Sequence, residues 1–144
     1  MNGMRVTPAE ALAAIGTIAV FVVAFFAPWD PAARGGTGAA VAGLIAVATA
    51  MAFGTKSRTP LVGGALLGVL LDTAYISGCA VAYELNWWGI SWRTFGDSGS
   101  GFFDAAFTVV FFAAPAAALG TALSALGSIA GHRWRASRRP SDGH

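Results

Sequence analysis

The side chain with the strongest chemical interest is Asp72, which stands alone in an otherwise uncharged apolar stretch over residues 61–83. If this stretch crosses a bilayer, the carboxyl group lies near the midplane, where insertion scales assign an aspartate a cost of roughly 2.5–3.5 kcal/mol. Desolvation favours the neutral acid at that depth. Acids in such positions serve as proton or ion relays, or they join helices or subunits by hydrogen bonds. The sequence leaves both interpretations open.

Two hydroxyl groups are the predicted hydrogen-bond partners of Asp72. Tyr75 follows it on the same helical face, and Thr17 lies near the middle of another apolar segment. The long apolar segments contain no Lys, Arg or His, so the sequence offers the carboxyl group no counter-charge at depth. Asp72, Tyr75 and Thr17 therefore form the candidate intramembrane polar site.

Other catalytic chemistry is scarce in this sequence. His132 and His144 lie in the C-terminal tail and are not joined by the companions that a metal site or a catalytic triad needs. Cys79 is the only cysteine and forms no internal disulfide. We therefore expect a protein that is not an enzyme and that uses neither a metal nor a cofactor.

The composition shows which elements must position Asp72. Of 144 residues, 56% are hydrophobic and 11% are charged, whereas soluble chains carry about a quarter charged residues. Three long segments contain no Asp, Glu, Lys or Arg, and a fourth contains only Asp72; they cover residues 11–28, 35–55, 59–83 and 105–131. Each reaches the roughly 18–20 residues that a spanning helix needs. The sequence predicts an all-α integral membrane protein, a four-transmembrane-helix bundle over residues 1–131, and a basic cytoplasmic tail over 132–144.

Local signals predict where two of the helices begin. Thr7 and Glu10 flank Pro8 in the arrangement of a capping box, with proline at the first helical position. Thr59 and Pro60 repeat this arrangement at the start of the third helix.

Two further patterns concern packing between the helices. Pro115 lies inside the fourth segment, where it should kink the helix. Small residues repeat at four-residue spacing, which lets helix backbones approach closely. These residues are Gly38, Ala42, Ala46, Ala50, Gly64, Gly68, Gly120, Ser124 and Ser128.

The distribution of positive charge predicts the orientation. With four crossings, the N-terminus, the second connection and the C-terminus share one side and hold seven of the nine Lys and Arg residues. The seven are Arg5, Lys56, Arg58, Arg133, Arg135, Arg138 and Arg139; the other side holds Arg34 and Arg93. Cytoplasmic segments carry the excess of positive charge. We expect a multi-pass protein of the cell (inner) membrane with both termini cytoplasmic.

The connection between the third and fourth helices is rich in aromatic residues. Trp88, Trp92 and Phe95 fall at helical spacing, and Trp87 lies beside them. This pattern predicts a short aromatic segment that lies in the membrane interface. It serves as a docking element for a partner or as an aromatic anchor, and the sequence leaves both roles open.

The arginines of the tail are candidates for binding lipid headgroups. Arg133, Arg135, Arg138 and Arg139 would each contribute about 1 kcal/mol near an anionic membrane surface. The alternative is that they serve only as the positive anchor that fixes topology. A nucleic-acid partner is not expected, since the sequence provides no folded basic surface.

Two classes of function are compatible with these features. The first is a non-enzymatic accessory or assembly subunit that docks to another membrane protein. The alternative is a self-associating permeability protein, either a proton-coupled small carrier or a holin-like pore former, that uses Asp72. The expected partners are the lipid bilayer and either a membrane protein or a second copy of this chain.

Overall fold

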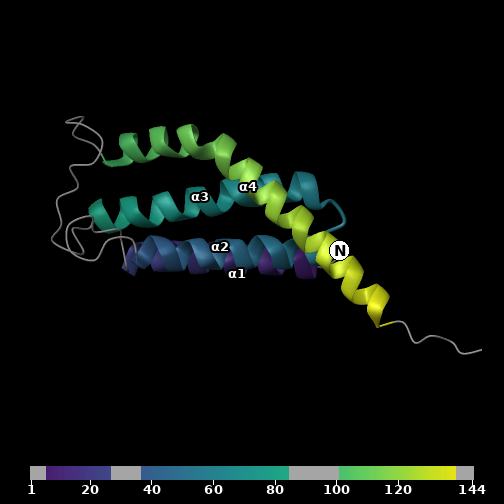
Figure 1. The fold of residues 1–144 in the computed structure, drawn as a ribbon. Helices are drawn as coiled ribbons and strands as arrows, with labels where there is room; N and C mark the ends of the chain where they lie inside the picture. The colour runs from purple at the N-terminus through teal and green to yellow at the C-terminus, as the bar shows by residue number, and fades with distance from the viewer. Residues whose placement is uncertain (1–5, 27–36, 85–100, 139–144) are drawn as a thin grey trace, which may run out of the picture.

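The computed structural model describes residues 6–26, 37–84 and 101–138, which form four α-helices (Figure 1). They are α1 (Pro8–Phe26), α2 (Thr37–Lys56), α3 (Pro60–Glu84) and α4 (Gly101–Ser137). All four are long and apolar enough to cross a membrane, which confirms the predicted number and type of helices. The aromatic segment predicted between α3 and α4, with Trp87, Trp88, Trp92 and Phe95, lies outside the described residues.

The two predicted helix starts are confirmed. The backbone N–H of Thr7 donates to Oε2 of Glu10 at 2.7 Å, and the N–H of Glu10 donates to Oγ1 of Thr7 at 3.2 Å. This is a complete capping box, which satisfies N–H groups that have no partner within the helix. α3 begins at Pro60, and the carbonyl of Thr59 accepts the first bond of this helix from Gly63 at 2.9 Å.

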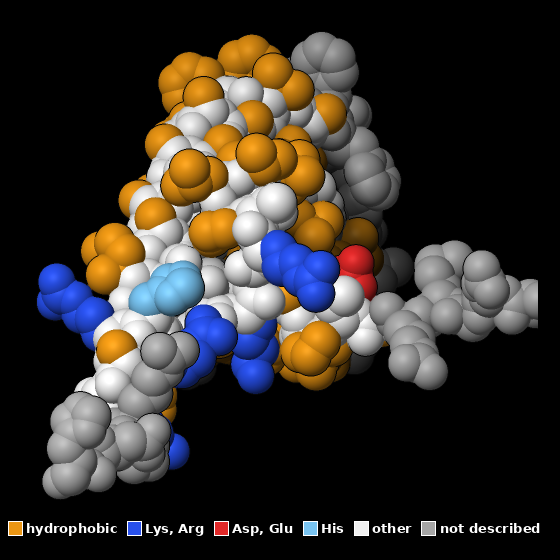
Figure 2. All heavy atoms as spheres, turned by 90° about the vertical axis from the view of Figure 1, so that its right-hand side faces the viewer, with side chains coloured by type: hydrophobic (Ala, Val, Ile, Leu, Met, Phe, Trp, Pro, Cys, Tyr) orange, Lys and Arg blue, Asp and Glu red, His pale blue; other side chains and the backbone are white. Residues whose placement is uncertain are grey.

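The helices alternate in direction, so three segments meet at one end of the bundle (Figure 1). These segments are the start of α1, the connection between α2 and α3, and the last turns of α4. We call this end the basic end, because its described part carries Lys56, Arg58, Arg133, Arg135 and Arg138. Figure 2 looks onto it and shows Lys and Arg side chains gathered there, below a surface of hydrophobic side chains. The sequence prediction that these cations share one side agrees with this arrangement.

Large hydrophobic side chains cover the outside of all four helices. Leu44 is 71% exposed, Leu66 is 68% exposed and Val110 is 76% exposed. Water would make such a surface unfavourable, whereas hydrocarbon covers it at no cost. The inside is a small cluster of mostly small and aliphatic side chains, which includes Val20, Ala50, Leu67 and Leu71.

Small residues bring α3 and α4 into close contact. A Cβ atom added to Gly68 would meet the backbone carbonyl of Ala116, and one added to Gly64 would lie 2.7 Å from the carbonyl oxygen of Gly120. The residue number of the contact on α4 falls from Gly120 to Ala116 as that on α3 rises from Gly64 to Gly68, so α3 and α4 are antiparallel. The predicted role of this small-residue spacing, close approach of helix backbones, applies within the chain.

Ser124 joins α4 to α2 in the same way. Its side chain is fully buried, and its hydroxyl donates to the carbonyl oxygen of Ala50 at 3.1 Å. Gly54 lies against the backbone of Ser124, so that no side chain separates the two helices at this point. The hydroxyl of Ser124 therefore joins α4 to α2 by a hydrogen bond, and this buried group has a hydrogen-bond partner.

α4 is longer than a membrane span needs and is not straight. Figure 1 shows its green part beside α3 and its yellow-green part turned across the bundle. Pro115 lies inside this helix and has no N–H to donate, so the carbonyl of Phe111 has no helical hydrogen-bond donor. The helix continues to Ser137, into the segment predicted as a tail. The domain boundary at residue 131 stays a prediction.

Candidate functional site

Asp72 lies in the middle of α3, one turn after Gly68, on the side of the helix that approaches α4. The residue is partly buried, and its Oδ2 atom is fully enclosed. No group in the described part of the chain forms a hydrogen bond with this oxygen. A buried polar atom without a partner costs about 1–3 kcal/mol. At Asp72 the packing thus buries an oxygen whose hydrogen-bonding capacity is not satisfied.

The two hydroxyl groups predicted to partner Asp72 are engaged elsewhere. The hydroxyl of Thr17 donates to the carbonyl of Ala13, one turn earlier in its own helix, at 2.7 Å. The hydroxyl of Tyr75 lies beside the thiol of Cys79. Hydroxyl groups in apolar helices often bond to their own backbone in this way. The hydrogen bonds expected from the sequence are therefore not formed within this bundle, and the role of the three residues as a site stays a prediction.

The packing of α1 on α3 nevertheless places Thr17 and Asp72 at the same depth. The thiol of Cys79 donates to the carbonyl of Ala24 at 3.8 Å, which fixes the register of these two parallel helices. Thr17 lies two turns before Ala24, and Asp72 lies two turns before Cys79. The sequence alone contains no information on this register.

A further polar group at this depth was not foreseen from the sequence. Because Gly68 packs on Ala116 in an antiparallel arrangement, one turn beyond Gly68 corresponds to one turn before Ala116. This places Asp72 near the level of Phe111, whose carbonyl receives no helical hydrogen bond from Pro115. Pro115 was the available signal, but its level relative to Asp72 depends on the register of α3 and α4.

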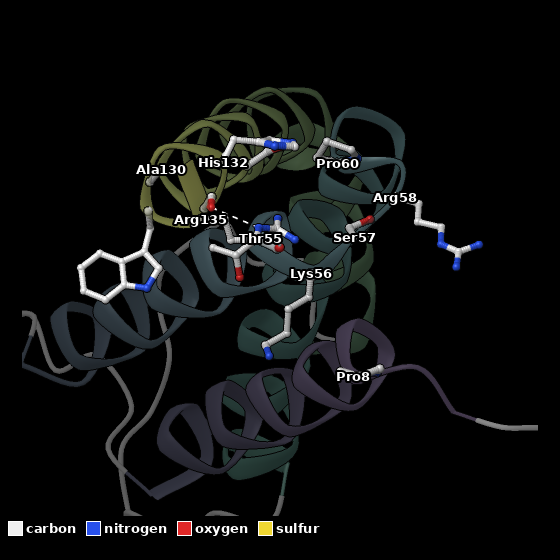
Figure 3. A pocket seen from close by; sticks show the side chains of 12 residues that line it. Pro8, Thr55, Lys56, Ser57, Arg58, Pro60, Ala130, His132 and Arg135 are labelled. Carbon is white, nitrogen blue, oxygen red and sulfur yellow. Dashed lines mark hydrogen bonds between the residues drawn. The ribbon is translucent and has the colours of Figure 1, made fainter. Parts of the chain in front are cut away.

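A second candidate site lies at the basic end. A cavity of about 1200 Å³ opens there between the start of α1, the connection from α2 to α3, and the last turns of α4 (Figure 3). Its lining includes Lys56, Arg58, His132 and Arg135. In the sequence, Lys56 and Arg58 indicate only the orientation, because nothing in their spacing shows that they approach α4.

The four arginines predicted to bind lipid headgroups differ in their surroundings. Arg135 lines the cavity at the basic end, whereas Arg133 and Arg138 do not. The guanidinium group of Arg138 lies 4.3 Å from the ring centre of Trp134, as in a cation–π contact. Arg139 lies outside the described residues.

Within the three described segments, no group of three His, Cys, Asp or Glu side chains lies close enough to hold a metal ion. Comparison with protein-family models, with curated proteins and with solved structures gives no match to this chain. The surfaces and polar groups of the bundle itself are therefore the features that indicate a function.

Proposed function

We propose that this chain is a multi-pass protein of the cell (inner) membrane and a non-enzymatic accessory or assembly subunit, which docks to another membrane protein through α4. The observation that carries the proposal is a row of exposed alanines, Ala114, Ala118 and Ala122, at four-residue spacing on α4. Within a membrane, small residues at this spacing let a second helix approach closely. We call this row the alanine stripe.

The alanine stripe differs from the other small-residue patterns of the bundle. Gly68 and Gly120 meet within the chain, so their faces are already occupied. On α2, Ala40 and Ala48 are exposed, but Leu44 lies between them on the same face and is 71% exposed. Since a large side chain keeps helix backbones apart, α2 is a poorer docking face than α4.

Replacement of Ala118 by leucine tests this proposal. The larger side chain should prevent close approach of a partner helix and lower its affinity about tenfold, because overpacking costs about 1–3 kcal/mol. Ala48→Leu introduces the same side chain at an exposed position of α2 and should leave the partner bound. The measurement is mass spectrometry of proteins that copurify stoichiometrically in mild detergent.

The two variants also separate the proposed function from its alternative. Loss of a stoichiometric foreign protein only in Ala118→Leu supports the accessory subunit. A homo-oligomer that dissociates in this variant supports self-association. Equal recovery of a partner with both variants contradicts docking through the alanine stripe.

The proposed orientation places both termini in the cytoplasm. It is supported by the excess of positive charge at the basic end, since cytoplasmic segments carry such an excess. In a Cys79→Ala background, a cysteine at Ser137 should react with a membrane-impermeant maleimide only after the cells are opened. A cysteine at Ser98, in the connection predicted to lie outside, should react in intact cells. Labelling of the Ser137 position in intact cells would reverse the orientation.

The alternative, a self-associating permeability protein, is favoured by one specific observation. The Oδ2 atom of Asp72 is enclosed and without a hydrogen-bond partner among the described residues. A carboxyl group kept in this condition at membrane depth is a candidate for binding and releasing a proton. Its test is the substitution of Asp72 by asparagine.

A further inference from the structure

The cavity at the basic end is an open hollow, and several exposed cationic groups lie around it. Lys56, Arg58 and Arg135 line it, and His132 adds an imidazole. Figure 3 shows Lys56 extending toward α1 and Arg58 pointing away from the other lining residues. These side chains come from two parts of the chain that are far apart in the sequence, the connection from α2 to α3 and the end of α4, so the fold itself brings their charges together.

No carboxylate balances this charge within the described lining of the cavity. Glu10 is the acidic residue of the first turn of α1, but it does not line the cavity, and its carboxylate accepts a hydrogen bond from the backbone of Thr7. Figure 2 shows acidic atoms on this face only at the edge of the basic group. The cavity therefore presents an excess of positive charge to any anion that enters it.

Arg135 is held in position by backbone groups. Its Nε donates to the carbonyl of Gly131 at 3.2 Å, and its Nη2 donates to the carbonyl of Thr55 at 3.3 Å. The second bond joins α4 to α2. A guanidinium group has five N–H donors, so donors are left over for a ligand after these two bonds. An arginine whose head group already forms two hydrogen bonds loses less conformational freedom when it binds an oxyanion than an unbonded one does.

A hydroxyl group adds a neutral donor to the lining. Oγ of Ser57 accepts a hydrogen bond from the N–H of Thr59 at 3.2 Å, which leaves the hydroxyl hydrogen of Ser57 available for donation. Guanidinium, ammonium and hydroxyl donors around one space match the oxygen atoms of a phosphate group.

We propose that this cavity is a binding site for a phosphate group, supplied by an anionic phospholipid headgroup or by free phosphate. Basic cavities between the ends of spanning helices are suited to phospholipid headgroups, since they lie at the level of the membrane surface. Trp134 also lines the cavity, as is common for aromatic side chains at that level. This site is independent of the alanine stripe and of any partner protein.

The test compares two neighbouring arginines on α4. Arg135→Gln removes a cation that lines the cavity, whereas Arg133→Gln removes an equal charge from a position outside it. With dioctanoyl phosphatidylglycerol as the probe and the full chain in detergent, native mass spectrometry should show about fivefold weaker binding for Arg135→Gln. Binding to Arg133→Gln should be close to that of the unaltered protein.

Three controls define the source and the specificity of the phosphate group. Dioctanoylglycerol, which lacks phosphate, should not bind. Displacement of the lipid by millimolar inorganic phosphate assigns the site to free phosphate, whereas retention of the lipid assigns it to the headgroup. Because Arg135 also contacts Thr55, Lys56→Gln provides a second variant that breaks no described hydrogen bond. Equal losses for Arg133→Gln, Arg135→Gln and Lys56→Gln, or no loss in any of them, would overturn the proposal.

Discussion

Replacement of Gly68 by alanine should destabilise the bundle by about 1–3 kcal/mol, although alanine is the better helix former. The added Cβ would lie 2.9 Å from the carbonyl carbon of Ala116 and 3.1 Å from Cα of Gly120. Both atoms belong to the backbone of α4, so no side chain can rotate away. The helices must move apart, and they then lose contacts along their length. The measurement is the free energy of unfolding in mixed micelles of a mild detergent and dodecyl sulfate.

Gly43→Ala is the matched control for this effect. A Cβ atom at Gly43 would meet no atom within 4 Å in the described part of the chain, apart from the neighbouring backbone of its own helix. Without a packing penalty, the intrinsic preference for alanine should leave the stability unchanged or raise it by up to about 1 kcal/mol. Opposite changes in the free energy of unfolding for Gly68→Ala and Gly43→Ala would show that α3 and α4 pack as described. Equal effects would show that Gly68 does not lie against Ala116 in the membrane.

The helices were predictable from the sequence because their signals are local. The capping box of Thr7 and Glu10 needs only a spacing of three residues, and the apolar segments need only length and the absence of charge. Helix contacts depend instead on which faces meet. Four-residue spacing indicated that Gly64 and Gly68 could support close packing, but it did not show that Gly120 opposes them.

The candidate sites were predictable only in part, for the same reason. Asp72 was conspicuous as a single carboxylate in an apolar segment, yet its surroundings follow from the register of α3 against α1 and α4. Thr17 lies level with Asp72, but its hydroxyl donates to Ala13 of its own helix, a competition that sequence spacing does not resolve. The cavity at the basic end joins Lys56 to Arg135, which are far apart in the sequence, and only the fold brings them together.

Asp72→Leu should make the bundle more stable by about 1–3 kcal/mol, because it removes a buried oxygen that has no hydrogen-bond partner among the described residues. Asp72→Asn should leave the fold intact, since the amide resembles the neutral acid in size. Thr73→Val is a suitable control: its hydroxyl already donates to the carbonyl of Val69 at 2.7 Å, so its loss relieves no unsatisfied group. A loss of stability in Asp72→Leu would show that the carboxyl group binds a partner outside the described chain.

The asparagine variant then separates the two functions proposed for this protein. Asparagine keeps hydrogen-bonding capacity but does not exchange a proton at physiological pH. If Asp72 is a relay, proton flux through liposomes containing the protein, measured with an enclosed pH-sensitive dye, should fall to the level of protein-free liposomes while the fold survives. If the protein is an accessory subunit, Asp72→Asn should retain its partner protein, and neither form should raise proton flux above that level. Equal flux through the unaltered protein and the variant, clearly above protein-free liposomes, would exclude Asp72 as the proton carrier.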